Sequence, residues 1–297
     1  MRTRAINAGM LRPLLPPRRK NSHKGDYGRL LIVAGSRGLT GAAVLAARAA
    51  LKTGAGLVTV ACPETERRLV AAALPEAMTF GAPCRNGAFS LKAASTIAAF
   101  AAGKKFDLLL AGPGLSTAGE TAAFAIRLLK LLELPAVLDA DALNAVALAG
   151  AFPRAEMPRL ITPHPGEAAR LLGSRIKDRP AAAAALARLC GGAAVLKGAG
   201  TLVSDGVLVL RNTTGGPELA KGGSGDVLAG FCAGLWAQAG LRAAFTLKTA
   251  FESAVLAAYL HGLCGELAAK KFTERGVLAS GLIDELPAAL RRAGVKA

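Results

Sequence analysis

The chain has 297 residues and few aromatic or acidic side chains: ten Phe, two Tyr and one Trp, and 20 Asp and Glu against 37 Lys and Arg. So few aromatic rings are unusual for a protein that stacks nucleic-acid bases. The formal net charge of +17 would attract a polyanion, but outside residues 18–24 the basic residues are dispersed. Because 52% of the residues are hydrophobic, the chain can bury a core. We therefore expect no nucleic-acid partner and keep a basic nucleic-acid-binding protein only as a distant alternative.

Paired cysteines and long apolar runs are also missing. The five cysteines are odd in number, widely spaced and without a CxxC pair, so they indicate small core residues rather than a disulfide framework or a zinc site. Residues 227–241 stay uncharged but fall short of the roughly 20 residues that span a bilayer, so they predict a buried helix and no membrane partner. Residues 1–20 lack a secretory signal and are interpreted as a basic leader, which makes a cytoplasmic location the expectation.

Short apolar segments alternate along the chain with segments rich in alanine and leucine. We expect strands at 29–34, 57–61, 107–111, 136–138, 159–161 and 193–196, and helices at 40–53, 120–132, after 141, and at 167–172 and 180–190. This alternation predicts an α/β fold with a mostly parallel sheet. The pair Asp205-Gly206 predicts a hairpin with a two-residue turn, and from Asp226 onward we expect mainly helix. No linker or repeat divides the chain, so residues 21–297 are predicted to form one domain.

A glycine-rich segment directly before an apolar helix carries the clearest chemical signal. Gly222, Gly223, Ser224 and Gly225 precede Asp226, so backbone N–H groups and the helix N-terminus can together form a cradle for an anion. Asp226 would lie close to the anion and could take a proton from a substrate hydroxyl. The alternative is an ordinary loop in which Asp226 caps the helix.

Other glycine loops also follow predicted strands. Lys197 to Thr201 (KGAGT) could receive the phosphates or the adenosine of a nucleotide, and residues 111–115 (AGPGL) could play a similar part, although glycines after a strand more often form only a tight turn. Residues 35–41 (GSRGLTG) lack the Gly-Lys-Ser/Thr ending of a phosphate-binding P-loop and are not a Walker motif.

Three polar residues at predicted strand ends keep two interpretations each. Asp139 and Asp141 could position Mg²⁺ or a substrate, or Asp141 could cap a helix. His164 lies between two prolines, where it could be a rigid donor to a ligand or an ordinary surface residue. His261 is interpreted as an ordinary helix residue, and no Ser/His/Asp triad can be assembled from the spacing.

Seven motifs in order carry a family resemblance: KGDYGRLLIVAGS, TGAAVLAARAALKTGAGLVTV, LLAGPGLS, VLDADALN, LITPHPGE, VLKGAGTLV and LAKGGSGDVLAG. Over about residues 20–290 the sequence resembles the ADP- or ATP-dependent NAD(P)H-hydrate dehydratases. The resemblance implies a ribokinase-like fold, a three-layer sandwich around a mostly parallel sheet. It also implies a hydro-lyase that restores NADH or NADPH from the S epimer of the hydrated dinucleotide. Mg²⁺ is the expected cofactor and ADP, or ATP, the co-substrate.

The resemblance also implies roles for individual residues. Asp226 is the expected catalytic base, and no residue is assigned as a metal ligand. The implied nucleotide contacts are Lys197, Gly198, Ala199, Gly200, Thr201 and Gly225. The implied contacts to the hydrated dinucleotide are Ala42, Ala43, Gly114, His164 and Asp226. Family members are usually oligomeric, often tetrameric, and the epimerase domain that many bacterial members carry is missing here, so a separate epimerase chain is the expected partner.

One residue departs from the family pattern. Lys221 stands before GGSGD, where a small polar residue is common, and an extra cation there could strengthen phosphate binding or hinder the substrate. The main alternative function is a ribokinase-fold small-molecule kinase such as hydroxyethylthiazole kinase, which would stop at a phosphorylated product. The motifs DADALN and TPHPGE favour the dehydratase.

Overall fold

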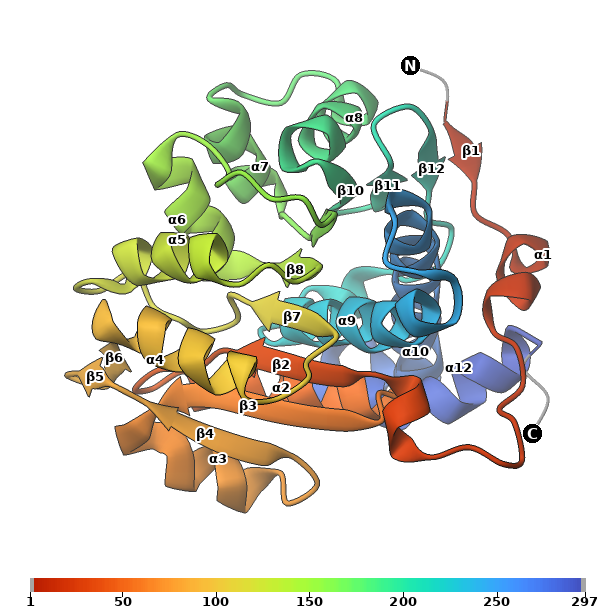
Figure 1. The fold of residues 1–297 in the computed structure, drawn as a ribbon. Coiled ribbons are helices and arrows are strands. Elements are labelled where there is room, and N and C mark those ends of the chain that lie inside the picture. Colours follow the sequence, from red (N-terminus) through yellow and green to blue (C-terminus); the bar gives the residue numbers. More distant parts are fainter. Residues whose placement is uncertain (1–2, 295–297) are drawn as a thin grey trace.

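A computed structural model describes residues 3–294 and contains a ten-stranded sheet between two layers of helices (Figure 1). The order across the sheet is β1-β12-β11-β10-β9-β8-β7-β2-β3-β4. The strand bounds are β1 Arg4–Ala5, β2 Arg29–Val33, β3 Leu57–Pro63, β4 Met78–Ala82, β7 Leu108–Ala111, β8 Ala136–Leu138, β9 Arg159–Ile161, β10 Gly192–Leu196, β11 Leu202–Ser204 and β12 Val209–Arg211. From β10 to β4 every neighbouring pair is parallel, which confirms the predicted fold class.

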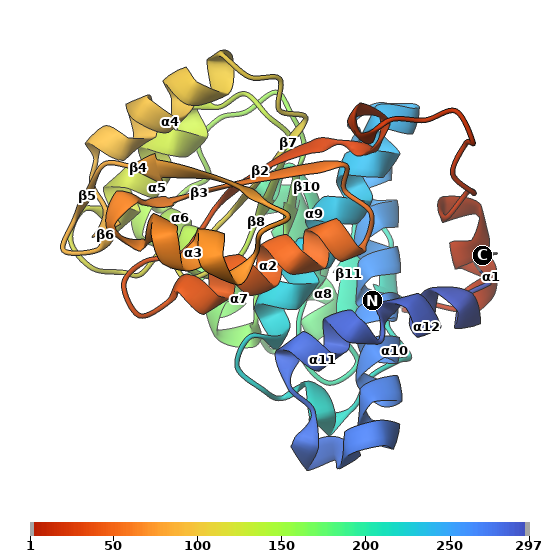
Figure 2. The same ribbon diagram turned by 90° about the horizontal axis from the view of Figure 1, so that it is seen from below.

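Successive side chains of the central strands pack on opposite faces of the sheet, as the pleat requires. Leu30 and Ile32 join one buried cluster, whereas Leu31 and Val33 join the other. The helices that cover the first face are α2 Thr40–Lys52, α3 Arg67–Ala73, α9 Ser224–Ala243, α10 Leu247–Gly276, α11 Ala279–Asp284 and α12 Leu286–Arg292. The second face is covered by α4 Lys92–Ala102, α5 Thr121–Leu131, α6 Ala140–Ala149, α7 Pro165–Leu172 and α8 Arg179–Cys190. Figure 2 shows α4 and α2 on opposite sides of β2 and β3, in the three-layer arrangement that the resemblance implied.

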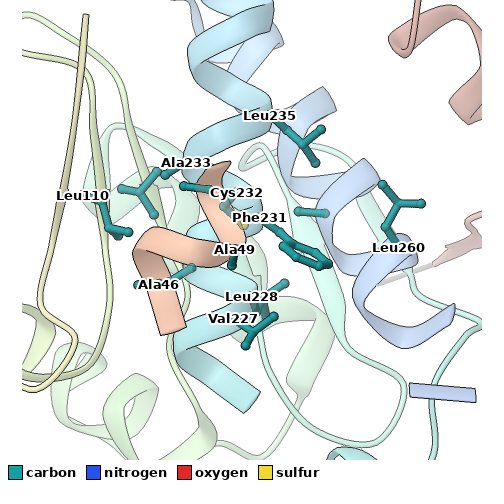
Figure 3. Close-up of a cluster of buried hydrophobic side chains, with 14 of the residues drawn as sticks. Ala46, Ala49, Leu110, Val227, Leu228, Phe231, Cys232, Ala233, Leu235 and Leu260 are labelled. Carbon is teal, nitrogen blue, oxygen red and sulfur yellow. The ribbon is translucent and has the colours of Figure 1, made fainter. Parts of the chain in front are cut away.

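Helix α9 is buried, as predicted, and packs closely against α2 (Figure 3). A Cβ on Gly230 would clash with the backbone oxygen of Ala46, and a Cβ on Gly234 would lie 2.5 Å from that of Ala50. Glycine is therefore needed at both positions for the two helices to touch. Because the contacts advance in the same direction along both helices, α2 and α9 run parallel and begin at the same end of the molecule.

The first twenty residues, interpreted from the sequence as a leader before the domain, belong to the domain from Arg4 onward; residues 1–2 lie outside the described part. Strand β1 pairs with β12 at the sheet edge, and it is followed by the short helix α1 Ala8–Leu11. Ile6 and Leu11 are buried in the main core. Burial of these two apolar side chains stabilises the packing of this arginine-rich segment against the domain.

Other local expectations also needed correction. The predicted hairpin β11–β12 is present, but the prediction of a two-residue turn is wrong, because residues 205–208 connect the two strands. The Asp205 carboxylate accepts hydrogen bonds from the N–H groups of Val207 and Leu208 in this connection. Strand β4 and the small sheet of β5 Cys84–Arg85 and β6 Ala88–Phe89 were not expected. All five cysteines are free, and all except Cys84 are buried.

Candidate active site

The loops that carry the sequence motifs meet at one edge of the sheet. Residues 112–116 follow β7, Asp139 follows β8, His164 lies shortly after β9, and Lys197 follows β10. Because these strands are parallel neighbours, their carboxyl ends lie side by side, which is where ligands bind in open α/β sheets.

A cavity of about 860 Å³ opens beside the start of α9, a volume typical of small-molecule sites. All the residues with implied nucleotide contacts line it: Lys197, Gly198, Ala199, Gly200, Thr201 and Gly225. Other lining residues come from the segment after β12 and from α10, and no sequence motif marked them: among them are Asn212, Thr214, Ala258 and His261. They reach the KGAGT loop only through the tertiary fold.

Lys197 lies at the centre of a buried ionic network. Its Nζ lies 2.8 Å from Oδ1 of Asp139 and 3.9 Å from Oε2 of Glu167, and the Thr162 hydroxyl donates to the same Asp139 oxygen at 2.7 Å. Burial alone would lower the pKa of Lys197, but the carboxylates of Asp139 and Glu167 outweigh burial and raise this pKa above its ordinary value. The ammonium group therefore stays charged beside the cavity, where it can bind an anion.

The two aspartates of DADALN serve as anchors within the protein. Asp139 has its side chain on Lys197 and not on the start of α6, which has no side-chain cap. Asp141 accepts from the N–H of Ser116 at 2.9 Å and from the Asn144 amide at 3.2 Å. The proposed capping role of Asp141 is therefore wrong, and its carboxylate fixes the loop that follows β7.

Asp226 lies in the first turn of α9 and is partly buried. Burial and the nearby carboxylates of Asp139 and Asp141 together raise the pKa of its carboxyl group to about 7, against the opposing effect of the Lys197 ammonium. A carboxyl group with a pKa near neutrality can take up and release a proton under physiological conditions. The alternative in which Asp226 caps α9 is wrong, because the N-cap residue is Gly223 and no side chain caps this helix.

The predicted anion cradle, residues 222–225, forms the N-terminus of α9. Gly223 has φ of +88°, a left-handed conformation that suits glycine. Among residues 3–294, no group accepts a hydrogen bond from the N–H of Gly225 or Asp226. A Cβ on Gly225 would lie 3.4 Å from Nζ of Lys197. An anion bound at the helix start would therefore meet backbone donors and the lysine together.

Two residues with implied contacts to the hydrated dinucleotide are neighbours. A Cβ on Gly114 would lie 3.0 Å from Cβ of Ala42 and 2.7 Å from the backbone oxygen of Leu39, so the loop after β7 rests on the first turn of α2. Ala42 is partly exposed, whereas Ala43 is fully buried beside Gly35. The structure therefore gives Ala43 no surface for a ligand and leaves Ala42 and Gly114 as the candidates.

His164 is the N-cap residue of α7. Its Nδ1 accepts from the N–H of Gly166 at 2.9 Å, and the Glu167 carboxylate accepts from the backbone N–H of His164 at 2.7 Å. Its Nε2 lies 3.5 Å from the Glu167 carboxylate, and half of the side chain is exposed. The ring is thus fixed in orientation, and its contact with a ligand stays a prediction.

Two basic side chains hold backbone segments at or near the cavity. Arg179 donates to the backbone oxygens of Ala199 and Lys197 and so fixes the KGAGT loop, a role that no sequence signal indicated. Lys221, the departure from the family pattern, lines the cavity, and its Nζ donates to the backbone oxygen of Arg275 at 2.6 Å.

Comparison with known proteins places this site in a family. A family model described as NAD(P)H-hydrate dehydratase matches residues 30–288. The chain belongs to this family. The bifunctional NAD(P)H-hydrate repair enzyme Nnr of Moorella thermoacetica is 43% identical to this chain. The match covers 97% of this chain and 54% of the Moorella enzyme. The Escherichia coli enzyme of the same name is 36% identical, over 95% of this chain and 51% of that protein. The chain thus spans about half the length of the curated relatives it matches.

Solved structures agree with the family assignment. The ADP/ATP-dependent NAD(P)H-hydrate dehydratase from Bacillus subtilis, co-crystallised with ATP and Mg²⁺, is 32% identical, with a TM-score of 0.81 and 99% of both chains covered. A hydroxyethylthiazole kinase from Pyrococcus horikoshii shares only the fold, at 13% identity and a TM-score of 0.56. In this dehydratase-family chain, no helix within residues 3–294 is long and apolar enough to cross a membrane.

Proposed function

We propose that this dehydratase-family chain removes water from the S epimer of hydrated NADH or NADPH, with ADP or ATP as the phosphoryl donor. The observation that carries the proposal is the position of Asp226, whose pKa is raised to about 7. Lys197, which lines the nucleotide cavity, is close enough to act electrostatically on this carboxyl group. Asp141, which holds the loop that follows β7 and contains Gly114, acts on it as well.

Asp226 accepts the proton of the ring hydroxyl while the hydroxyl oxygen forms a bond to the terminal phosphorus of the nucleotide. The bridging P–O bond breaks, and AMP leaves if the donor is ADP. The ring nitrogen then expels phosphate as the C–O bond breaks, and loss of a ring proton restores the dihydropyridine. The Lys197 ammonium and the free N–H groups of Gly225 and Asp226 stabilise negative charge on the transferred phosphoryl group.

Mg²⁺ fits this site as an ion held mainly by the nucleotide. Within residues 3–294 no group of three or more His, Cys, Asp or Glu could hold a metal ion. Asp139 and Asp141 are already engaged by Lys197 and Ser116. Mg²⁺ commonly binds substrate phosphates and water with few protein ligands, and it neutralises charge on the phosphate oxygens.

The remaining expectations stay predictions. Assembly as a homo-oligomer, in particular a tetramer, is tested by light scattering on the purified chain. Supply of the S epimer by a separate NAD(P)H-hydrate epimerase is tested by a coupled assay of the two enzymes. A cytoplasmic location is tested by cell fractionation. Binding of nucleic acid, the distant alternative, would appear as a salt-dependent gel shift.

The deciding experiment incubates the chain with hydrated NADH, Mg²⁺ and either ADP or ATP, and follows the return of dihydronicotinamide absorbance. Asp226→Asn should lower the rate by about 10²–10⁴-fold, the usual contribution of a general base. Asp205→Asn, in the distant β11–β12 connection, is the matched control and should keep the wild-type rate. A stable phosphorylated product detected by mass spectrometry would instead establish a kinase, and an Asp226→Asn variant with the wild-type rate would refute the assignment of the base.

A further inference from the structure

His261 is a buried residue of α10 that lies behind the anion cradle. Its Nε2 lies 2.9 Å from the backbone oxygen of Ser224 and 3.2 Å from the hydroxyl oxygen of the same residue. Both residues line the cavity assigned to the nucleotide. His261 therefore contacts the first residue of α9 from the protein interior.

These contacts determine which ring nitrogen of His261 carries the proton. A backbone oxygen can only accept, so Nε2 is the donor to Ser224. Burial lowers the pKa of His261 to about 4, so the ring is neutral at physiological pH and its single proton is on Nε2. The hydroxyl oxygen of Ser224 can then only accept from this N–H, which leaves its own hydrogen available for another acceptor.

The same turn of α10 also holds the segment after β12, which lines the cavity too. The Asn212 side-chain amide donates to the backbone oxygen of Ala258 at 2.9 Å, and the Thr214 hydroxyl donates to that of Tyr259 at 2.7 Å. No side chain caps the N–H groups at the start of α9, and His261 supplies a side-chain contact to the first residue of this helix. One rigid turn of α10 thus sets the relative positions of the segment after β12 and the cradle.

We propose that Ser224 donates its hydroxyl hydrogen to a phosphate oxygen of the bound nucleotide and that His261 is the positioning residue that directs this hydroxyl into the cavity. The inference rests on the proposed function, since it takes the ligand of the cavity to be ADP or ATP. It assigns Ser224 and His261 to nucleotide binding rather than to the hydrated dinucleotide.

Isothermal titration calorimetry with ADP and with ATP, each with Mg²⁺, tests the proposal on the wild type, Ser224→Ala, His261→Leu and His261→Gln. Each of Ser224→Ala and His261→Leu should remove the hydrogen bond to the charged phosphate and so raise the Kd for the nucleotide by about tenfold or more. His261→Gln keeps an N–H donor at about the reach of Nε2 and should restore most of the affinity. The KM for hydrated NADH should stay at the wild-type value in all three variants.

A double mutant separates positioning from general destabilisation. If His261 acts through the Ser224 hydroxyl, His261→Leu should weaken Kd far less in the Ser224→Ala background than in the wild type. Ser253→Ala removes another buried hydroxyl from α10, beside a separate cavity lined by Leu14 and Leu256, and should leave Kd unchanged.

The outcomes distinguish this inference from the proposed function. Additive effects of the two substitutions, or a His261→Leu variant with a lower Tm but the wild-type Kd, would overturn the positioning role. If the wild type turns over hydrated NADH while both single variants keep their affinity, only this inference fails. A wild type that binds neither nucleotide would overturn the inference and the proposed function together.

Discussion

The Lys197 ammonium group and the Asp139 carboxylate form an ion pair at 2.8 Å, and the Asp139 side chain is only 2% exposed. Lys197 follows β10 and Asp139 follows β8, two strands that β9 separates in the sheet, and the two residues are 58 positions apart in the sequence. Because the Glu167 carboxylate also lies 3.9 Å from the Lys197 Nζ, a single ammonium group compensates two buried carboxylates. The charge that faces the nucleotide cavity is thus also part of the buried structure.

Lys197→Met should destabilise the chain strongly, because it leaves Asp139 and Glu167 buried without their cation. Removing one partner of a buried ion pair typically costs about 3–5 kcal/mol, which urea unfolding would measure. The double variant Lys197→Met with Asp139→Asn removes one of the stranded charges and should recover part of the stability. An unchanged unfolding free energy in Lys197→Met would contradict the network.

The rate should depend on pH through the ionisation of Asp226. The group acts as a base only when deprotonated and has a pKa of about 7, so kcat/KM should rise with pH up to about 7 and then level off. The measurement is the pH profile at low concentration of hydrated NADH. A flat profile between about pH 5 and 8 would contradict this assignment.

Stability should respond to Asp226 in the opposite direction. Folding raises its pKa from an ordinary value of 3.8 to about 7, so the folded chain holds this proton more tightly and loses stability as pH rises between these values. Asp226→Asn, which stays neutral, should therefore raise Tm at pH 8 by roughly 2–4 °C for each kcal/mol recovered. Near pH 4 the two proteins should have similar Tm values, and an equal difference at both pH values would exclude the ionisation of Asp226 as the cause.

The close contact between α2 and α9 predicts a cost for any side chain at its glycines. Gly230→Ala would force Cβ against the backbone of Ala46 and should destabilise the chain by about 1–3 kcal/mol in thermal or urea unfolding. Gly281→Ala in α11, where a Cβ meets nothing within 4 Å, is the matched control and should be neutral or slightly stabilising. Equal effects of the two substitutions would show that helix propensity, not helix contact, dominates.

Local patterns were sufficient where neighbouring residues decide the structure. The apolar run of α9, the glycines before it and the alternation of strands and helices follow from periodicity and from the needs of turns, and the structure confirms them. The short strand β1 depends instead on pairing with β12, 206 positions away in the sequence. The connection at 205–208 also differs, because the Asp205 side chain stabilises a wider turn than the dipeptide pattern predicts.

By itself the sequence determined the α/β architecture, the glycine-rich start of α9 that we interpret as an anion cradle, and the position of Asp226 on this helix, because each follows from residues that are close together in the chain. Only the tertiary structure decided that Asp139 pairs with Lys197 and that His261 holds Ser224. It also decided that Ala43 is buried while Ala42 remains accessible. Charge compensation, hydrogen bonding and burial depend on distances in space, and strands and helices far apart in the chain set those distances.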